Sequence, residues 1–180
     1  MLIYYGDTAV GCVDTDFTKL IYKTMNTDED NCVDFEEFVI YTWDFLSQEL
    51  PYFVFSLIDK DKTQLLPMSH ILEMAQRIHG VKHGGNYTLE QTIYRMKADY
   101  HGRVSMEEFR DHCGRHQSIL GPASALQNKM RRAIIGELYW KDVEFKRFRN
   151  MPGKSVWDIL KRTEQEVSDA EITLNFDENM

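Results

Sequence analysis

The stretch NTDEDNCVDFEE, residues 26–37, decides which fold this sequence predicts. Oxygen-bearing side chains occupy alternating positions, and a glutamate closes the stretch. A calcium ion takes about 6–8 oxygen ligands, and a twelve-residue loop supplies them from positions 1, 3, 5, 7, 9 and 12. The predicted metal ligands are Asn26, Asp28, Asp30, the backbone carbonyl of Cys32, Asp34 and Glu37. The pattern predicts a site for one calcium ion.

Two asparagines weaken this pattern without abolishing it. Position 6 needs a left-handed turn, and asparagine, here Asn31, is the best substitute for glycine in that conformation. At position 1, Asn26 offers a carbonyl oxygen but lacks the charge of an aspartate. We therefore expect weakened calcium binding. The alternative interpretation is a solvated acidic loop that holds no metal.

Apolar residues at helical spacing flank this loop on both sides, and the same order of apolar run, turn-rich loop and second apolar run occurs twice more. The three loops are residues 26–37, 59–70 and 97–108. Val33 stands at position 8 of the first loop, where an apolar side chain can join a short strand with a neighbouring loop, and Phe38 is expected to face the core. The chain therefore predicts three helix–loop–helix units.

The loop at 59–70 lacks a closing carboxylate. Asp59, Asp61 and Thr63 occupy positions 1, 3 and 5, but His70 stands at position 12. Imidazole is a poor ligand for calcium and cannot replace a bidentate carboxylate. We expect a weak or vestigial metal loop that is retained for packing.

The loop at 97–108 keeps Asp99, Gly102 and Glu108 but begins with Lys97. The ammonium group of a lysine repels a dication. We expect this loop to be free of metal, with Lys97 lying near Asp99 and Glu108 as an internal counter-ion.

Residues 14–117 resemble the EF-hand superfamily, on the motif NTDEDNCVDFEEF and its two repeats. The order of units is similar to the second to fourth hands of neuronal calcium sensors and calcineurin B-like proteins, through DFEEFVIY, FVFSLIDKDKTQLL and RMKADYHGRVSMEEF. The chain departs from them in lacking a complete first hand and, with Leu2 after Met1, a myristoylation signal. The resemblance implies an all-α array of EF-hand pairs with short two-stranded links between loops.

The pattern changes after residue 120. Residues 1–120 form the predicted EF-hand region, and residues 121–180 form a C-terminal helical extension with an acidic tail. The segment 121–149 is interpreted as one long or broken helix, and Ser155 as the N-cap of a helix over 155–167. The basic, aromatic segment 129–154 either packs on the acidic half of the chain or binds an acidic partner surface, lipid or nucleic acid.

One face of the extension is apolar. It carries Ile119, Ala123, Leu126, Met130, Ala133 and Ile134. We predict that this face docks against the second and third units and covers a groove there. The groove is expected to be lined by Phe53, Phe55, Leu72, Met74, Met96 and Phe109.

Composition excludes several classes of function. The 180 residues carry a net charge of −8, so the chain as a whole is not expected to bind nucleic acid or an anionic membrane. No apolar run approaches the roughly 20 residues that span a bilayer, and the start lacks the features of a signal peptide. Three cysteines favour a reducing, cytoplasmic compartment over a disulfide framework. No nucleophile motif supports an enzyme.

The leading prediction is a calcium-binding regulatory sensor or adaptor that has one functional loop, two degenerate loops and a protein partner bound through an amphipathic helix. The alternative is a scaffold subunit whose contacts ignore calcium. Because EF-hands pair, the first loop needs a mate. That mate is the segment AVGCV at 9–13, a second copy of the chain, or a part of a longer protein.

Overall fold

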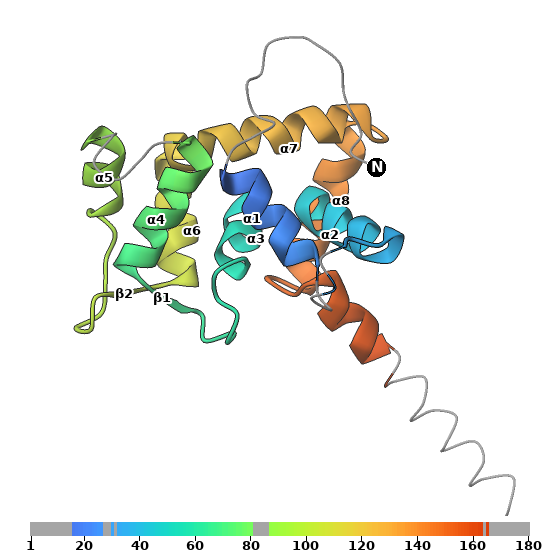
Figure 1. Cartoon of the computed structure of the whole chain (residues 1–180), viewed down its shortest axis with the longest axis horizontal. Helices are drawn as coiled ribbons and strands as arrows, with labels where there is room; N and C mark the ends of the chain where they lie inside the picture. The colour runs from blue at the N-terminus through green and yellow to red at the C-terminus, as the bar shows by residue number, and fades with distance from the viewer. Residues whose placement is uncertain (1–15, 27–29, 31, 81–86, 164, 166–180) are drawn as a thin grey trace, which may run out of the picture.

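A computed structural model describes residues 16–26, 30, 32–80, 87–163 and 165. The described chain is mostly helical and has one small antiparallel sheet, which confirms the all-α class (Figure 1). The elements are α1 (Asp16–Met25), α2 (Phe35–Ser47), α3 (Leu50–Ser56), β1 (Leu65–Pro67), α4 (Met68–His79), α5 (Tyr87–Ile93), β2 (Arg103–Ser105), α6 (Met106–Arg115), the 3-10 helix η1 (Gln117–Leu120), α7 (Gly121–Ala133) and α8 (Glu137–Asn150). No helix in these ranges is long and apolar enough to cross a bilayer.

Each of the three predicted loops lies between two helices. The first follows α1 and runs into α2, the second joins α3 to α4, and the third joins α5 to α6. The strands β1 and β2 join the second loop to the third, with Leu66 opposite Val104. These two residues stand at position 8 of their loops, and both are buried. The predicted two-stranded link is therefore present between these loops.

The mate of the first loop is not identified. Val33, the position-8 residue of that loop, lies in no strand of the described chain. The segment 9–13, predicted as one candidate partner, lies outside the described residues. The pairing of the first loop stays a prediction.

One apolar cluster forms the core, and it includes side chains of the C-terminal extension. The six side chains predicted to line a groove are all buried in this cluster. Both α1 and α7 contact α4, and Leu126 and Met130 of α7 pack against the cluster. Figure 1 shows α7 along the top of the view, above α1 and α4. Ile119, Ala123 and Ile134 also contact the cluster, whereas Ala133 is exposed, so the predicted packing face is confirmed except at Ala133.

The segment 121–149 is the broken helix of the two predicted alternatives, because α7 ends at Ala133 and α8 begins at Glu137. The extension differs from its prediction in one respect, since α8 packs on α2 of the first unit, whereas α7 reaches α4 of the second (Figure 1). Beyond α8, residues 156–163 are helical. The predicted N-cap is present, since the Ser155 hydroxyl accepts the Asp158 N–H at 3.1 Å.

The break between α7 and α8 places Ile135 at a φ of +68°, although its side chain is 69% exposed. A β-branched residue is strained in this conformation, whereas asparagine tolerates it. Ile135→Asn should therefore raise the free energy of unfolding by about 1 kcal/mol, measured by urea denaturation. Leu138→Asn, at an exposed position inside α8, is the control and should give no gain. A loss of stability in Ile135→Asn as large as in the control would contradict the expectation.

Candidate metal centre

The first loop begins where α1 ends. The backbone N–H of Asn26 donates to the Tyr22 carbonyl at 3.3 Å, so Asn26 follows directly on the last turn of α1. The Oδ1 atom of Asn26 is buried and accepts no hydrogen bond within the described part of the chain. Asp28, the predicted position-3 ligand, and Asn31 at the turn lie outside the described residues. The loop thus opens with a buried acceptor for which the described residues supply no donor.

The middle of the loop is held by a local turn. The carboxylate of Asp30 accepts the backbone N–H of Cys32 at 2.7 Å. Such a bond orders the chain around a short acidic residue. It leaves the carbonyl of Cys32, the predicted position-7 ligand, as a backbone acceptor of the same turn.

The end of the loop is the N-terminus of α2. The Asp34 carboxylate accepts the Glu37 N–H at 2.8 Å, and the Glu37 carboxylate accepts the Asp34 N–H at 3.3 Å. This reciprocal capping box satisfies two donors of the first turn. Asp34 and Glu37, predicted as ligands at positions 9 and 12, are therefore brought together by the start of the helix.

Phe38 does not face the core, contrary to the sequence prediction. Its side chain is 41% exposed, whereas Glu37 and Ile40 of the same helix are buried. Successive residues of an α-helix are turned by about 100°. The buried side of α2 carries Glu37 and Ile40, so Phe38 points away from it.

The loop suits a hard cation by the kind of donors that it offers. All six predicted ligands present oxygen atoms, and the Asn26 oxygen is buried with no donor from the part of the chain that the structure describes. Among the described residues, no three His, Cys, Asp and Glu side chains form a group that could hold a metal ion, and Asp28 is not among those residues. The fit to calcium therefore depends on the Asn26 oxygen and on the all-oxygen donor set.

The second loop is closed by its own hydrogen bonds. One oxygen of Asp59 accepts from the backbone and the hydroxyl of Thr63, at 3.0 and 2.9 Å, and the other accepts the Gln64 N–H at 2.7 Å. Gln64 takes the left-handed turn, with φ +58°. Asp61 is exposed, as is His70. Asp59 and Thr63 are thus brought together, and their oxygens already have donors.

The third loop corrects the role predicted for Lys97. Asp99 accepts the backbone N–H groups of His101 and Arg103, both at 2.8 Å, and the Arg103 guanidinium lies 2.9 Å from its other oxygen. The backbone bond from Arg103 lowers the pKa of Asp99. Lys97 contacts Glu108 through its backbone N–H, at 3.0 Å. The cation paired with Asp99 is therefore Arg103, because β2 places its side chain beside the turn.

A buried charged cluster on α2 was not predicted from the sequence. We call Asp44 and the groups that bind it, on Gln48, Arg147 and Val156, the Asp44 cluster. Asp44 accepts from the Arg147 guanidinium, from Gln48 Nε2 at 2.8 Å and from the Val156 N–H at 2.9 Å. Burial raises the pKa of Asp44, and Arg147 opposes that rise. The signal available in the sequence was the carboxylate of Asp44 between the apolar residues of α2.

The C-terminal end of α2 is also bound by the extension. Gln127 donates to the carbonyls of Phe45 and Gln48, at 2.5 and 3.2 Å. Arg131 donates to the Leu46 carbonyl at 2.8 Å and pairs with Glu144 of α8 at 2.6 Å. The last carbonyls of a helix lack intrahelical donors and favour a cation. These two side chains of α7 therefore cap α2, and this arginine of the basic segment points inward.

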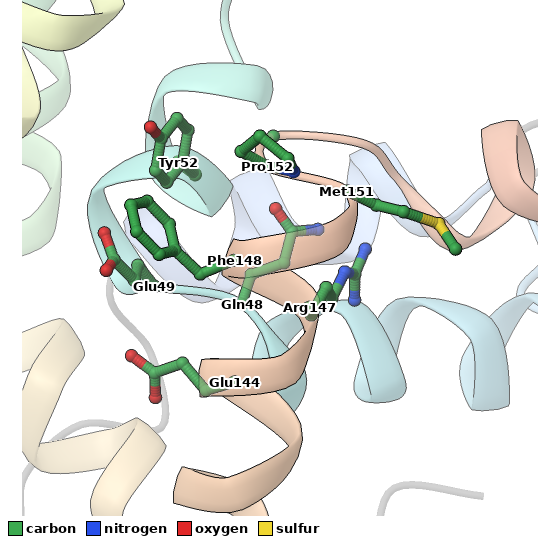
Figure 2. A pocket seen from close by; sticks show the side chains of 9 residues that line it. Gln48, Glu49, Tyr52, Glu144, Arg147, Phe148, Met151 and Pro152 are labelled. Carbon is green, nitrogen blue, oxygen red and sulfur yellow. The ribbon is translucent and has the colours of Figure 1, made fainter.

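A small hollow lies beside the Asp44 cluster. Figure 2 shows Arg147 of α8 next to Gln48, with Met151 and Pro152 of the following turn nearby. Arg110 of α6 lies over the ring of Phe148, one of the lining residues, at 4.7 Å. The hollow is lined by Gln48, Glu49, Tyr52, Glu144, Arg147, Phe148, Met151, Pro152 and Gly153. It is a junction between α3 and the extension.

Comparison of the chain with protein-family models, with curated proteins and with solved structures gave no match. The interpretation of the loop at 26–37 therefore depends on its own residues and geometry.

Proposed function

We propose that this chain is a calcium-binding EF-hand protein that acts as a regulatory sensor or adaptor through the loop at 26–37. The observation that carries the proposal is the buried Oδ1 of Asn26, which has no donor in the described chain and stands at position 1 of an all-oxygen donor set. An acceptor buried without a partner is costly, and a cation supplies one. Asn26, Asp28, Asp30, the Cys32 carbonyl, Asp34 and Glu37 would hold the ion.

The other two loops serve as packing elements in this proposal. The carboxylates of Asp59 and Asp99 already accept hydrogen bonds from their own loops. The pairing of β1 with β2 joins these loops without metal. A single calcium ion per chain is the expected stoichiometry.

A protein partner fits the exposed side of α2. Phe35 and Val39 stand four residues apart on one helical face and are exposed, and Trp43, one turn further, is 38% exposed beside Trp140. Such a stripe is typical of a surface that receives an amphipathic helix. A reducing, cytoplasmic compartment fits the free thiols of Cys32 and Cys113.

Isothermal titration calorimetry of chelator-treated protein tests the proposal. We expect one calcium ion per chain, and Glu37→Gln should weaken binding at least about tenfold, because affinity follows ligand charge. Glu36→Gln is the matched control, since it removes the same charge from the exposed neighbouring position. A stoichiometry of two or more would show that the second or the third loop also binds calcium.

Absence of binding would favour the alternative, a calcium-independent scaffold built on degenerate EF-hands. The bonds from Gln127, Arg131 and Arg147 to α2 favour that alternative, because they hold the helix without metal. Equal affinity of the parent and of Glu37→Gln would instead place the ion elsewhere in the chain.

A further inference from the structure

One face of α2 joins the candidate calcium loop to the Asp44 cluster. Glu37 and Asp44 are seven residues, about two helical turns, apart, so they lie on the same face. They are 6% and 4% exposed. Tyr41 lies between them, and its pKa is raised by burial and then by the charges of Asp44 and Glu37. Because both carboxylates belong to the same helix, a displacement of α2 at one of them is transmitted to the other.

The far end of this face holds the last described helix. Asp44 accepts the backbone N–H of Val156 through both oxygens, at 2.9 and 3.1 Å. Val156 is the first residue of the helix at 156–163. Lys62 of the second loop holds the same helix from the other side, through Asp158 at 2.5 Å. Docking of this helix therefore depends on where α2 places Asp44.

Glu37, at the N-terminal end of this face, is not arranged to bind an ion through both oxygens. The Glu37 carboxylate accepts the Asp34 N–H, at 3.3 Å, whereas a residue at position 12 has to present both oxygens to an ion. Glu37 is buried in the first turn of α2, so its side chain has little room for another rotamer. We expect Glu37 to reach a bidentate position through a shift of α2 itself.

We propose that calcium binding at 26–37 and docking of the helix 156–163 on Asp44 oppose each other through α2. The inference depends on the proposed function, and it adds the regulation of that same site. Coupling between two sites is reciprocal. Calcium should therefore loosen the helix 156–163, and loosening that helix should strengthen calcium binding.

Amide hydrogen exchange of the full chain tests the first direction. Amides in 156–163 should exchange about tenfold faster with calcium chloride than with chelator, within the range usual for allosteric coupling. Glu37→Gln, which keeps the shape of the side chain, should show no such change. Calorimetry on the same samples reports whether calcium is bound.

Val156→Pro tests the reverse direction. It removes the N–H that Asp44 accepts, and proline is suited to the first position of a helix. Calcium should bind this variant several-fold more tightly, by about the same factor as in the exchange experiment. Val156→Ala is the matched control, because it trims the same side chain but keeps the N–H, and its affinity should stay near that of the parent.

The outcomes separate the two proposals. If calorimetry shows no calcium binding by the parent chain, the proposed function fails, and the coupling fails with it. If the parent binds calcium and the exchange of 156–163 is unchanged or slower, only the coupling is overturned. The exchange result decides the matter even where Val156→Pro does not fold. In a folded Val156→Pro, calcium affinity equal to or below that of Val156→Ala also overturns it.

Discussion

Arg147→Met should lower the free energy of unfolding by about 3–5 kcal/mol, because removing one partner of a buried ion pair leaves the other charge uncompensated. Arg147 and Asp44 are both buried, and Arg147 also donates to Ser47 Oγ and to the Lys154 carbonyl. Methionine keeps much of the length and apolar volume of the arginine stem, so the loss reports mainly on the charge. Urea denaturation at neutral pH measures it.

The same variant should show a characteristic pH dependence. Burial already raises the pKa of Asp44 above 3.8, and without the Arg147 charge it should rise further. A carboxyl whose folded pKa lies above its unfolded value favours the folded state when protonated, and this contribution is lost as the pH rises through the folded pKa. The gap in stability between parent and Arg147→Met should therefore widen as the pH rises from the unfolded pKa of an aspartate through the folded pKa of Asp44 in the variant.

Arg149→Met is the matched control on the same helix. Arg149 is exposed and lies over the Phe145 ring at 5.6 Å. An exposed cation–π contact of this kind contributes about 0.5–1 kcal/mol. If Arg147→Met costs no more than Arg149→Met, the Asp44 cluster does not stabilise the fold.

Trp140→Ala should lower the free energy of unfolding by about 3–5 kcal/mol, the cost usual for truncating a buried aromatic side chain. Trp140 is 1% exposed and meets Trp43 of α2 edge-on, with ring centroids 5.1 Å apart. Its Nε1 donates to the Ile134 carbonyl at 2.5 Å, across the break between α7 and α8. The side chain therefore attaches α8 both to α2 and to α7. Chemical denaturation followed by far-UV circular dichroism measures the loss.

Two further variants separate the contributions of Trp140. Trp140→Phe keeps an aromatic ring but removes the indole donor, and the Ile134 carbonyl keeps the Gly136 N–H at 2.8 Å, so about 0.5–1.5 kcal/mol should be lost. Phe145→Ala, at an exposed position of α8, should cost no more than about 0.5–1 kcal/mol, the contribution of its contact with Arg149. A loss in Trp140→Ala as small as in Phe145→Ala would mean that α8 does not depend on this contact.

The local features of the fold could be predicted from the sequence because short-range patterns determine them. The helical class follows from apolar residues at intervals of three and four. The pairing of Leu66 with Val104 follows from their shared position 8 in two loops, and the Ser155 cap from its place before an apolar run. The candidate ligands of the first loop also follow from spacing alone, whereas calcium binding itself stays a prediction.

The errors of the sequence analysis concern directions in space. Spacing alone did not show that Phe38 lies on the exposed side of α2, since that depends on where α8 packs. It placed Lys97 beside Asp99, whereas the strand β2 brings Arg103 there. Spacing alone also did not decide between one long helix and a broken helix over 121–149. The structure shows the break, because Ile135 and Gly136 adopt positive φ.

By itself, the sequence determined the order of helices and loops, the oxygen donors at 26–37 and the loss of donors in the other two loops. Only the tertiary structure showed that Asp44 binds Arg147 and Val156, more than one hundred residues further along the chain. It also showed that Gln127 and Arg131 cap α2. Local propensity contains no information on such partners, because a buried charge finds its counter-charge only when distant helices pack together.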